Sequence, residues 1–432
     1  MKPLLIKNAH IVDPASGFDA TGALLVENGL ISARTAGASP GAPEGAQIID
    51  AKGMLLAPGL IDMRVFTGEP GREYRETLSS AAQAAAAGGV TSFVCMPDTM
   101  PVIDDGAVVD FIIRRAEANS LVNILVSAAI TKGLEGKEIC EFGLLKEAGA
   151  ICLSDGRRSI QSAALLRHAF YYAKNFEMPV IHHLSDYGLS GGGVMNKGLF
   201  ATTLGLKGIA PEAQSIPLMR DLALAEITGA SYHAAQISTP ASLEAMAGAR
   251  QKTANVSAGI SINNLCLNEI DIGSYRTFFK LDPPLGSEES RMALVAGLKS
   301  GVIDTIHSGH DPQDVEVKRR PFAEAAFGAI GLETLFSAAM RLVHSGDVEL
   351  KTILAAMTIN PARILKLASG RLSPGAPADF LLADLDYPWV ASANSIISRS
   401  KNSPFEDARF SAKIMATYVG GRLVYKYEGE KA

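Results

Sequence analysis

The amino-acid sequence predicts an α/β protein, a (β/α)₈ barrel accompanied by a small β domain. Through the middle of the chain, short apolar runs alternate with helix-like stretches, which is the pattern of successive βα units. Both ends of the chain are β-rich instead. The eight expected barrel strands are a run that ends near Phe66, Val90–Cys95, Asn123–Ala129, Ala150–Leu153, Pro179–His183, Ser231–Ile237, Asn255–Ile260 and Asp304–His307.

A doubly wound open sheet is the main alternative, because it also alternates strands with helices. That fold normally carries Gly-x-Gly-x-x-Gly directly after its first strand, and this sequence has no such motif there. The glycine run Gly191–Gly193 lies too far beyond its strand to form a phosphate-binding loop. The closed barrel is therefore the expected fold, with its active site at the C-terminal ends of the strands.

The two ends of the chain share short β-like runs that are separated by Gly, Pro and Asn. Between them, Gly37–Glu44 is rich in Pro, Gly and Ala and is expected to be a loop. We expect residues 1–57 and 368–432 to build one small β-sandwich domain beside a barrel at residues 58–367. The expected strands of this domain are Leu4–Val12, Ala23–Ala33, Gln47–Asp50, Ala378–Asp384 and Ile414–Tyr427.

Composition narrows the functional classes. The chain has 432 residues, a formal net charge of -5 and 47% hydrophobic residues, which suits a large soluble protein. The negative charge argues against binding to nucleic acids or anionic membranes, and no run approaches the roughly 20 apolar residues of a membrane-spanning helix. The basic run Lys318–Arg320 is expected to lie in a solvated loop. Four cysteines without a Cys-x-x-Cys pair indicate a reduced, cytoplasmic protein.

The segment Pro58–Phe66, which ends the first expected barrel strand, is the most informative part of the chain. It resembles the first strand of cyclic amidohydrolases, which reads Pro-Gly-Leu-Ile-Asp-x-His-x-His and whose two histidines hold a catalytic metal. Arg64 and Phe66 stand at those two positions. Phe has no lone pair to donate, and Arg stays protonated and repels cations, so neither side chain replaces a metal ligand.

Further segments resemble dihydroorotases of the class that includes the multifunctional and transcarbamoylase-associated types. They occur in the expected order along nearly the whole chain, so the resemblance implies an amidohydrolase-type barrel, although a fold alone does not imply activity. The matching segments are Gly89–Ser92, Met96–Pro101, Gly192–Asn196, Arg220–Glu226, Gly331–Thr334, Ser400–Phe405 and Val419–Gly421.

The resemblance also implies a reaction, the opening of a cyclic amide by a hydroxide that bridges two divalent metals, with an Asp on the eighth strand moving the proton. Gly309 stands where that Asp is expected and provides no proton acceptor. Gln236 replaces a metal histidine of the sixth strand. Asp155 lies near the position of a carboxylated Lys or an Asp, and His183 aligns with a retained metal histidine, so these two side chains could still bind a cation.

The substrate contacts that the resemblance implies are also changed. Gly68 stands at the Arg that clamps the substrate carboxylate, Asp98 at its partner Asn, and Gln313 at a histidine that also reaches the carboxylate. An anion such as Asp98 repels an anionic substrate. Metal ligands, base and carboxylate clamp are altered together, so we assign no catalytic residue.

Two interpretations of the remaining polar residues stay open. In the first, which we favour, the chain binds no metal, because isolated histidines are usually hydrogen-bonded neighbours. In the second, a single zinc ion is held by some of four side chains. These are Asp155, His183, His307 and His310.

Two functional classes follow. The first is a pseudoenzyme of de novo pyrimidine biosynthesis that forms a homo-oligomer and acts as a structural or regulatory partner of aspartate transcarbamoylase, a partner that the resemblance implies. The second is an active dihydroorotase, or a related hydantoinase- or allantoinase-like hydrolase, with a rebuilt mononuclear metal site. Asp311 is the only nearby candidate for a replacement base, and it lies two residues from the expected position. The altered residues favour the first class.

Overall fold

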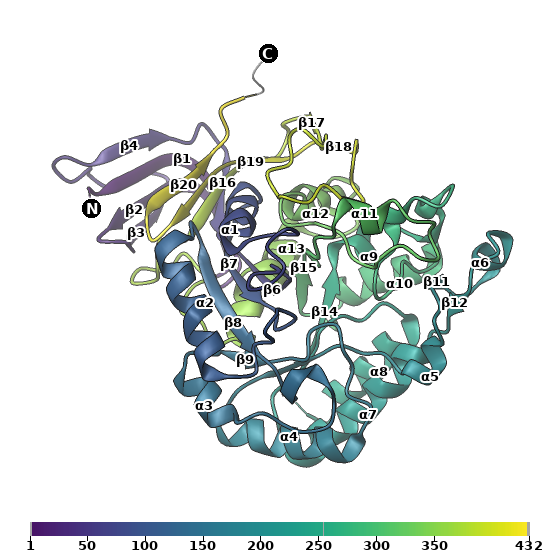
Figure 1. The fold of residues 1–432 in the computed structure, drawn as a ribbon. Helices are drawn as coiled ribbons and strands as arrows, with labels where there is room; N and C mark the ends of the chain where they lie inside the picture. Colours follow the sequence, from purple (N-terminus) through teal and green to yellow (C-terminus); the bar gives the residue numbers. More distant parts are fainter. Residues whose placement is uncertain (1, 254, 430–432) are drawn as a thin grey trace.

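Eight parallel strands form the barrel that the sequence predicts (Figure 1). The computed structural model describes residues 2–253 and 255–429. The strands follow one another in chain order around the barrel, and the backbone N–H of Phe66 donates to the carbonyl of His310 at 2.9 Å, which joins the first strand to the last. The barrel strands are β6 (Leu60–Val65), β7 (Val90–Cys95), β8 (Asn123–Ala128), β9 (Cys152–Leu153), β10 (Val180–His182), β13 (Tyr232–Ala234), β14 (Val256–Ser261) and β15 (Thr305–His307).

Helices cover the outside of the barrel, and α1 (Leu78–Ala87) illustrates how the sequence forms them. The Thr77 hydroxyl accepts from the backbone N–H of Ser80, and the Ser80 hydroxyl accepts from that of Thr77, so the first turn is capped twice. The long helices are α1, α2 (Gly106–Asn119), α4 (Ala163–Asn175), α7 (Glu212–Thr228), α8 (Pro240–Arg250), α10 (Glu288–Lys299), α12 (Leu335–His344) and α13 (Leu350–Met357). The shorter ones are α3 (Phe142–Glu147), α5 (Tyr187–Ser190), α6 (Leu199–Thr203), α9 (Ile262–Cys266), α11 (Val315–Lys318) and α14 (Ile359–Ile364).

The inside of the barrel is filled with apolar side chains below its mouth. Ile61, Met63, Val94 and Ile181 form an interior cluster, against which α14 packs. A larger apolar layer lies between the strands and the outer helices. The filled interior is typical of barrels of this size, whose ligands bind above the side-chain layers. Among the described residues, no helix combines the length and the hydrophobicity that crossing a membrane requires.

Both ends of the chain contribute to one eight-stranded sheet beside the barrel, which confirms the shared terminal β domain (Figure 1). The predicted run Ala23–Ala33 is two strands, because Asn28 and Gly29 adopt left-handed backbone angles and turn the chain back in a hairpin. The strands are β1 (Leu4–Asp13), β2 (Phe18–Glu27), β3 (Leu30–Ala36), β4 (Gln47–Asp50), β5 (Leu55–Pro58), β16 (Phe380–Asp384), β19 (Lys413–Val419) and β20 (Arg422–Lys426).

This sheet has two apolar faces. One face forms its own core, which includes Ile6, Leu24 and Phe380. The other face places Leu381 and Ile414 in the apolar layer of the barrel, so the two parts pack together. The division at residues 58 and 367 stays a proposal, and residues 1 and 430–432 of the terminal segments lie outside the described residues.

Two short pairs of strands lie outside the barrel and the terminal sheet. The pairs are β11 (Met195–Asn196) with β12 (Gly208–Ile209), and β17 (Trp389–Val390) with β18 (Arg409–Phe410).

The expectation of a solvated loop at Lys318–Arg320 is wrong for its first residue. Lys318 ends α11 and is only 3% exposed, because its ammonium donates to the carbonyls of Thr277 and Ala326.

Candidate functional site at the barrel mouth

The C-terminal ends of the barrel strands surround an open pocket of about 460 Å³. Arg64 comes from β6, Ser261 ends β14, and Gln236 and Gly309 follow β13 and β15. The pocket therefore lies where barrels of this kind carry their active sites. Its walls are formed by Arg64, Phe66, Arg157, Gln236, Ser261, Asn263, Asn264, Leu281, Asp282, Gly309, Asp311, Phe327, Gly328 and Ala329.

Arg64 places a buried guanidinium in this pocket. The residue is 4% exposed, its Nη1 donates to the Gly156 carbonyl at 3.4 Å, and its Nη2 lies 3.5 Å from Nδ1 of His183. Its guanidinium carbon lies 5.2 Å from the centre of the Phe66 ring. No carboxylate of the described residues forms an ion pair with Arg64. Burial lowers the pKa of Arg64 below its usual value, because the charged form loses its hydration.

His183 is held between Arg64 and a carboxylate that sequence reasoning missed. The Nε2 atom of His183 lies 3.3 Å from Oδ2 of Asp282, whose side chain is 37% exposed at the pocket rim. Burial alone would raise the pKa of Asp282, but His183 and Arg64 hold it below its usual value. Each ring nitrogen of His183 therefore faces a charged side chain.

Arg157 is a second arginine of the mouth. Its Nε donates to one carboxylate oxygen of Asp311 at 2.8 Å and its Nη2 donates to the other, while its Nη1 lies 3.4 Å from Asp98. The guanidinium also stacks over the Phe66 ring at 3.9 Å from the ring centre. Burial would lower the pKa of Arg157, but Asp311 and Asp98 outweigh it and raise the pKa above its usual value. The mouth is thus occupied by a charged network.

Asp155 points away from this network. One of its oxygens accepts from the backbone N–H groups of Ile130 and Thr131 at 2.8 and 2.9 Å, and the other accepts from the Thr131 hydroxyl at 2.5 Å. Burial raises the pKa of Asp155, although these donors act in the opposite direction. Asp155 anchors the loop that follows β8.

Three further replaced positions near the mouth are Gly309, Gln236 and Gln313. Gly309 adopts a left-handed φ of 63°. The Gln236 side chain donates to Oδ1 of Asn264 at 2.9 Å. The Gln313 side chain donates to Asp311 at 2.6 Å, which adds to the contacts of that carboxylate. None of these groups is a base poised over the pocket.

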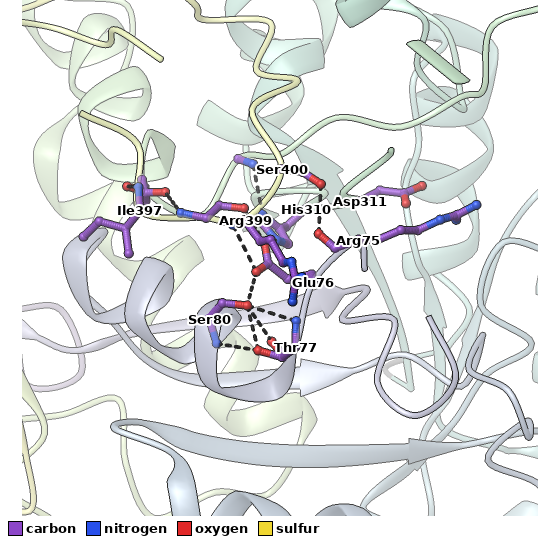
Figure 2. Close-up of polar contacts among 12 residues, drawn as sticks. Arg75, Glu76, Thr77, Ser80, His310, Asp311, Ile397, Arg399 and Ser400 are labelled. Carbon is purple, nitrogen blue, oxygen red and sulfur yellow. Dashed lines mark hydrogen bonds and ion pairs between the residues drawn. The ribbon is translucent and has the colours of Figure 1, made fainter. Parts of the chain in front are cut away.

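The two histidines at the end of the eighth strand do not face a common centre. His307 is fully buried, its ring nitrogens have no hydrogen-bond partner among the described residues, and burial pulls its pKa well below the usual value. His310 turns toward Glu76, with Nε2 of His310 lying 3.5 Å from the carboxylate (Figure 2). Glu76 also accepts from the hydroxyls of Ser398 and Ser80. His310 therefore belongs to a contact between the barrel and the C-terminal segment.

Gly68 lines a second, smaller pocket of about 290 Å³ next to the first. Phe66 and Arg157 belong to both pockets, so the two hollows meet along these side chains. Asp98 lines the smaller one, and its Oδ2 atom is buried without a hydrogen-bond partner in the described part of the chain. The backbone of Gly156 passes so close to this carboxylate that a Cβ there would lie 1.4 Å from Oδ2.

The side chains at the mouth do not fit a metal centre. Arg64 repels cations, Phe66 has no donor atom, and both oxygens of Asp155 are engaged by N–H and O–H donors. In the part of the chain that the structure describes, no three His, Cys, Asp or Glu side chains come together as ligands. A structural zinc or a binuclear site needs at least three such donors. That the purified protein binds no metal stays a prediction.

Sequence reasoning found most positions of the mouth but missed two of its charged partners. Arg157 follows the fourth strand by only a few residues, so its position was a usable signal. Asp98 at the position of an Asn was a second signal, because a carboxylate at a barrel mouth is commonly paired with a nearby arginine or lysine. Asp282 lies in a long loop after the seventh strand and has no such signal.

Comparison with known proteins supports the resemblance. A family model described as Dihydro-orotase-like matches residues 53–242. The chain is 40% identical to a dihydroorotase of Pelobacter propionicus over 423 residues, which cover 98% of this chain and 99% of that protein. It is 38% identical to a dihydroorotase of Syntrophus aciditrophicus with the same coverage.

Solved structures share the fold at lower identity. An L-hydantoinase from Arthrobacter aurescens superposes with a TM-score of 0.89 at 23% identity, over 100% of this chain and 97% of that one. A dihydropyrimidinase from Brevibacillus agri gives a TM-score of 0.84 at 20% identity, over 98% and 95% of the two chains. These likenesses confirm the amidohydrolase type of barrel. With full-length relatives near 40% identity, the chain belongs to the dihydroorotase family.

Proposed function

We propose that this chain is a non-catalytic dihydroorotase-family protein of pyrimidine biosynthesis and acts as a structural or regulatory partner of aspartate transcarbamoylase. The position of Arg64 carries this proposal. Its guanidinium extends from the first barrel strand to within 3.5 Å of His183, the histidine that aligns with a metal ligand of the family. A fixed positive charge at this place opposes binding of the cations on which the family reaction depends.

The surroundings of Asp311 support the loss of proton transfer. Gly309 offers no side chain, and Asp311 is the nearest carboxylate in sequence. Both Asp311 oxygens accept from Arg157, and one also accepts from Gln313. With both oxygens engaged by these donors, Asp311 is not placed to take a proton from a nucleophile in the pocket. The alternative, a hydrolase with a rebuilt mononuclear site, therefore lacks a base as well as ligands.

The partner is suggested by the resemblance and by what the chain retains. The barrel is complete, its helices are present and the terminal sheet packs against it. A protein that keeps a complete barrel while its mouth is altered is suited to act through contacts with other chains. We propose that the outer helices and loops contact aspartate transcarbamoylase, and that the chain itself forms a homo-oligomer.

Metal analysis and an activity assay test the first part of the proposal. Protein purified without added metal is expected to contain far less than one metal ion per chain and to leave dihydroorotate and carbamoyl aspartate unconverted. Two metal ions per chain, or turnover that is lost on chelation, would contradict the proposal. Turnover that resists chelators and is lost in Asp311→Asn or His310→Gln would favour the rebuilt site.

Co-expression with aspartate transcarbamoylase tests the partner. The two chains are expected to elute together in size-exclusion chromatography, and the transcarbamoylase is expected to lose stability or activity when this chain is omitted. If the transcarbamoylase elutes alone with normal activity and stability, the partner proposal fails, whatever the metal analysis gives.

A further inference from the structure

We propose that a pocket outside the barrel mouth binds a small molecule through a single carboxylate or phosphate group, which Arg158, Ser159 and Tyr187 hold. This side pocket lies between residues 134–136 of the loop that follows β8, residues 155–161 of the loop that follows β9, and Tyr187 at the start of α5. Its cavity volume is about 310 Å³. Small-molecule pockets range from roughly 300 to 1,000 Å³, so the side pocket has room for a ligand.

The side pocket is separate from the pocket at the barrel mouth, and the two share no lining residue. Arg157 lines the mouth and pairs with Asp311, whereas Arg158, the next residue, lines the side pocket. Asp155 also lines the side pocket, but its oxygens are engaged by donors of the loop that follows β8. A ligand of the side pocket therefore binds outside the site at which the family reaction takes place.

Three hydrogen-bond donors of the side pocket are available to a ligand. Ser159 is 4% exposed, and its Oγ atom has no hydrogen-bond partner among the described residues. The Tyr187 hydroxyl accepts from the backbone N–H of Ser159 at 3.0 Å, which leaves its own O–H to donate. Arg158 donates through Nη1 to the Leu134 carbonyl at 2.9 Å and keeps its other N–H groups. A buried donor such as the Ser159 hydroxyl costs free energy until an acceptor reaches it.

The charges of the side pocket favour an anion as that acceptor. Arg158 is the one Lys or Arg among the described lining residues. The two lining carboxylates do not neutralise it, because Glu135 pairs with the exposed Lys137 at 3.0 Å and Asp155 accepts from N–H and O–H donors. A guanidinium forms charge-assisted hydrogen bonds with a carboxylate or phosphate, and these are stronger than neutral ones. A second anionic group would meet the two carboxylates, so one anionic group is the class that fits.

Hydrogen bonds within the protein hold both walls of the side pocket. On one side, the backbone N–H of Gly136 donates to the Thr131 hydroxyl at 3.0 Å. On the other side, the Gln161 side chain donates to the Ser159 carbonyl at 2.9 Å and accepts from the backbone N–H of Tyr187 at 3.2 Å. The site is thus formed before a ligand arrives, which reduces the entropy that binding costs.

The apolar part of the lining describes the rest of the ligand. Leu134 is buried, and Tyr187 is 50% exposed, so its ring offers a face on which a second ring can pack. A small organic molecule with a short carbon body or one ring, and with one anionic group, satisfies both the donors and the apolar surface. The volume excludes a nucleic acid or a folded protein partner.

A titration of the purified full chain, followed by saturation-transfer NMR at low ionic strength, tests the side pocket. The probes are benzoate, phenyl phosphate and the neutral benzamide, which share one ring and differ in the attached group. We expect benzoate or phenyl phosphate to bind with a Kd of about 1 mM or below, and benzamide to bind at least about tenfold more weakly. The tighter of the two anions identifies a carboxylate or a phosphate site.

Two variants assign the binding to the side pocket. Arg158→Gln is expected to weaken binding of the anion by about tenfold or more, because it removes the charged donor. Ser159→Ala is expected to weaken binding by about threefold or more and to leave the melting temperature of the free chain unchanged or higher, because its hydroxyl has no partner among the described residues. A serine with a purely structural role would lower that melting temperature and leave binding intact.

Arg114→Gln on α2 is the matched control, since the Arg114 side chain is 77% exposed and lies outside the lining of the side pocket. It is expected to leave binding unchanged. If neither anion binds, if benzamide binds as tightly as the anions, or if Arg114→Gln weakens binding as much as Arg158→Gln, the inference is overturned. The inference goes beyond the proposed function, because the titration needs no metal, no turnover and no transcarbamoylase.

Discussion

The Nη2 atom of Arg64 lies 3.5 Å from Nδ1 of His183 inside the barrel mouth. This contact puts a cation of the protein next to the histidine that aligns with a metal ligand of the family. Asp282 on the other side of His183 completes a row of charged and ionisable groups, with 3.3 Å between its Oδ2 and the Nε2 of His183. Unlike a bound metal ion, the Arg64 guanidinium cannot coordinate a water molecule and lower its pKa to produce a nucleophilic hydroxide.

The first prediction concerns the stability cost of Arg64. We expect Arg64→Met to leave stability unchanged or to raise the free energy of unfolding by about 1 kcal/mol. The buried guanidinium has no carboxylate partner among the described residues, so the free energy it loses by desolvation exceeds what its weak contacts supply. Urea denaturation followed by circular dichroism measures the change. Arg114→Met on the exposed side of α2 is the control and is expected to have little effect. A clear loss of stability in Arg64→Met would mean that its contacts outweigh its desolvation.

The second prediction concerns the contact between the barrel and the C-terminal segment. Glu76→Ala removes the acceptor of the Ser398 hydroxyl and of the Arg399 backbone N–H, and the carboxylate that faces His310 (Figure 2). Because the buried Ser398 hydroxyl and the partly buried Arg399 N–H then lack this acceptor, we expect a loss of about 3 kcal/mol in the free energy of unfolding. Amide hydrogen exchange is expected to accelerate at residues 396–400 first.

Glu73→Ala is the matched control for this variant. Glu73 lies in the same loop but is exposed, and its carboxylate accepts from the backbone N–H of Gly71. Its removal is expected to leave exchange at residues 396–400 unchanged. Equal exchange in the two variants would rule out Glu76 as the anchor of this segment.

The sequence predicted the strands better than the side-chain contacts at their ends. All eight barrel strands lie where apolar runs indicated, because burial between helices and interior imposes a hydrophobic pattern on each strand. The pair of Arg157 with Asp311 joins residues 154 positions apart. No local pattern encodes such a pair, and only the closed barrel brings its members together. The same reason hid Asp282, which contacts His183 from a loop after another strand.

The resemblance was equally uneven. It located Gly309, Gln236 and Gly68 at the mouth, where the structure places them. It could not indicate that Asp155 would turn to the Thr131 loop, since its hydrogen bonds depend on the course of that loop. Aligned positions thus gave the place of a residue, while the direction of its side chain followed from packing.

The third prediction concerns restoring the acid at residue 309. Gly309→Asp is expected to produce no turnover, because metal ligands and clamp are missing and such groups act as a unit. It is also expected to lower the free energy of unfolding by about 1–2 kcal/mol, since the φ of 63° disfavours a side chain. A Cβ there would also lie 3.0 Å from Oγ of Ser261.

Gly301→Asp separates the two causes of that loss. Gly301 also has a left-handed φ, of 78°, but a Cβ at this residue would have no atom of the described residues within 4 Å beyond its chain neighbours. Its variant therefore reports backbone strain alone, and Gly309→Asp is expected to be the less stable of the two in urea denaturation. Dihydroorotate turnover in Gly309→Asp would contradict the view that ligands, clamp and base were lost together.

The last prediction concerns pH and the buried Lys318. Burial lowers the pKa of Lys318 to about 7 in the folded chain, against roughly 10.4 in an unfolded chain. Between these two values the unfolded state binds more protons than the folded state. The free energy of unfolding therefore gains a contribution as pH rises through this window, and loses it as pH falls toward the folded pKa. The contribution between pH 7 and pH 10 is on the order of 3 kcal/mol.

Lys318→Met lacks this titrating group. Its free energy of unfolding is therefore expected to rise less between pH 7 and pH 10 than that of the unchanged chain. Urea denaturation at the two pH values measures the difference, and other titrating groups cancel because they are common to both proteins. Lys137→Met is the control, since the Lys137 side chain is 79% exposed and pairs with Glu135. If Lys318→Met and the unchanged chain respond equally to pH, Lys318 remains protonated in the fold, and its two carbonyl partners at Thr277 and Ala326 compensate for burial.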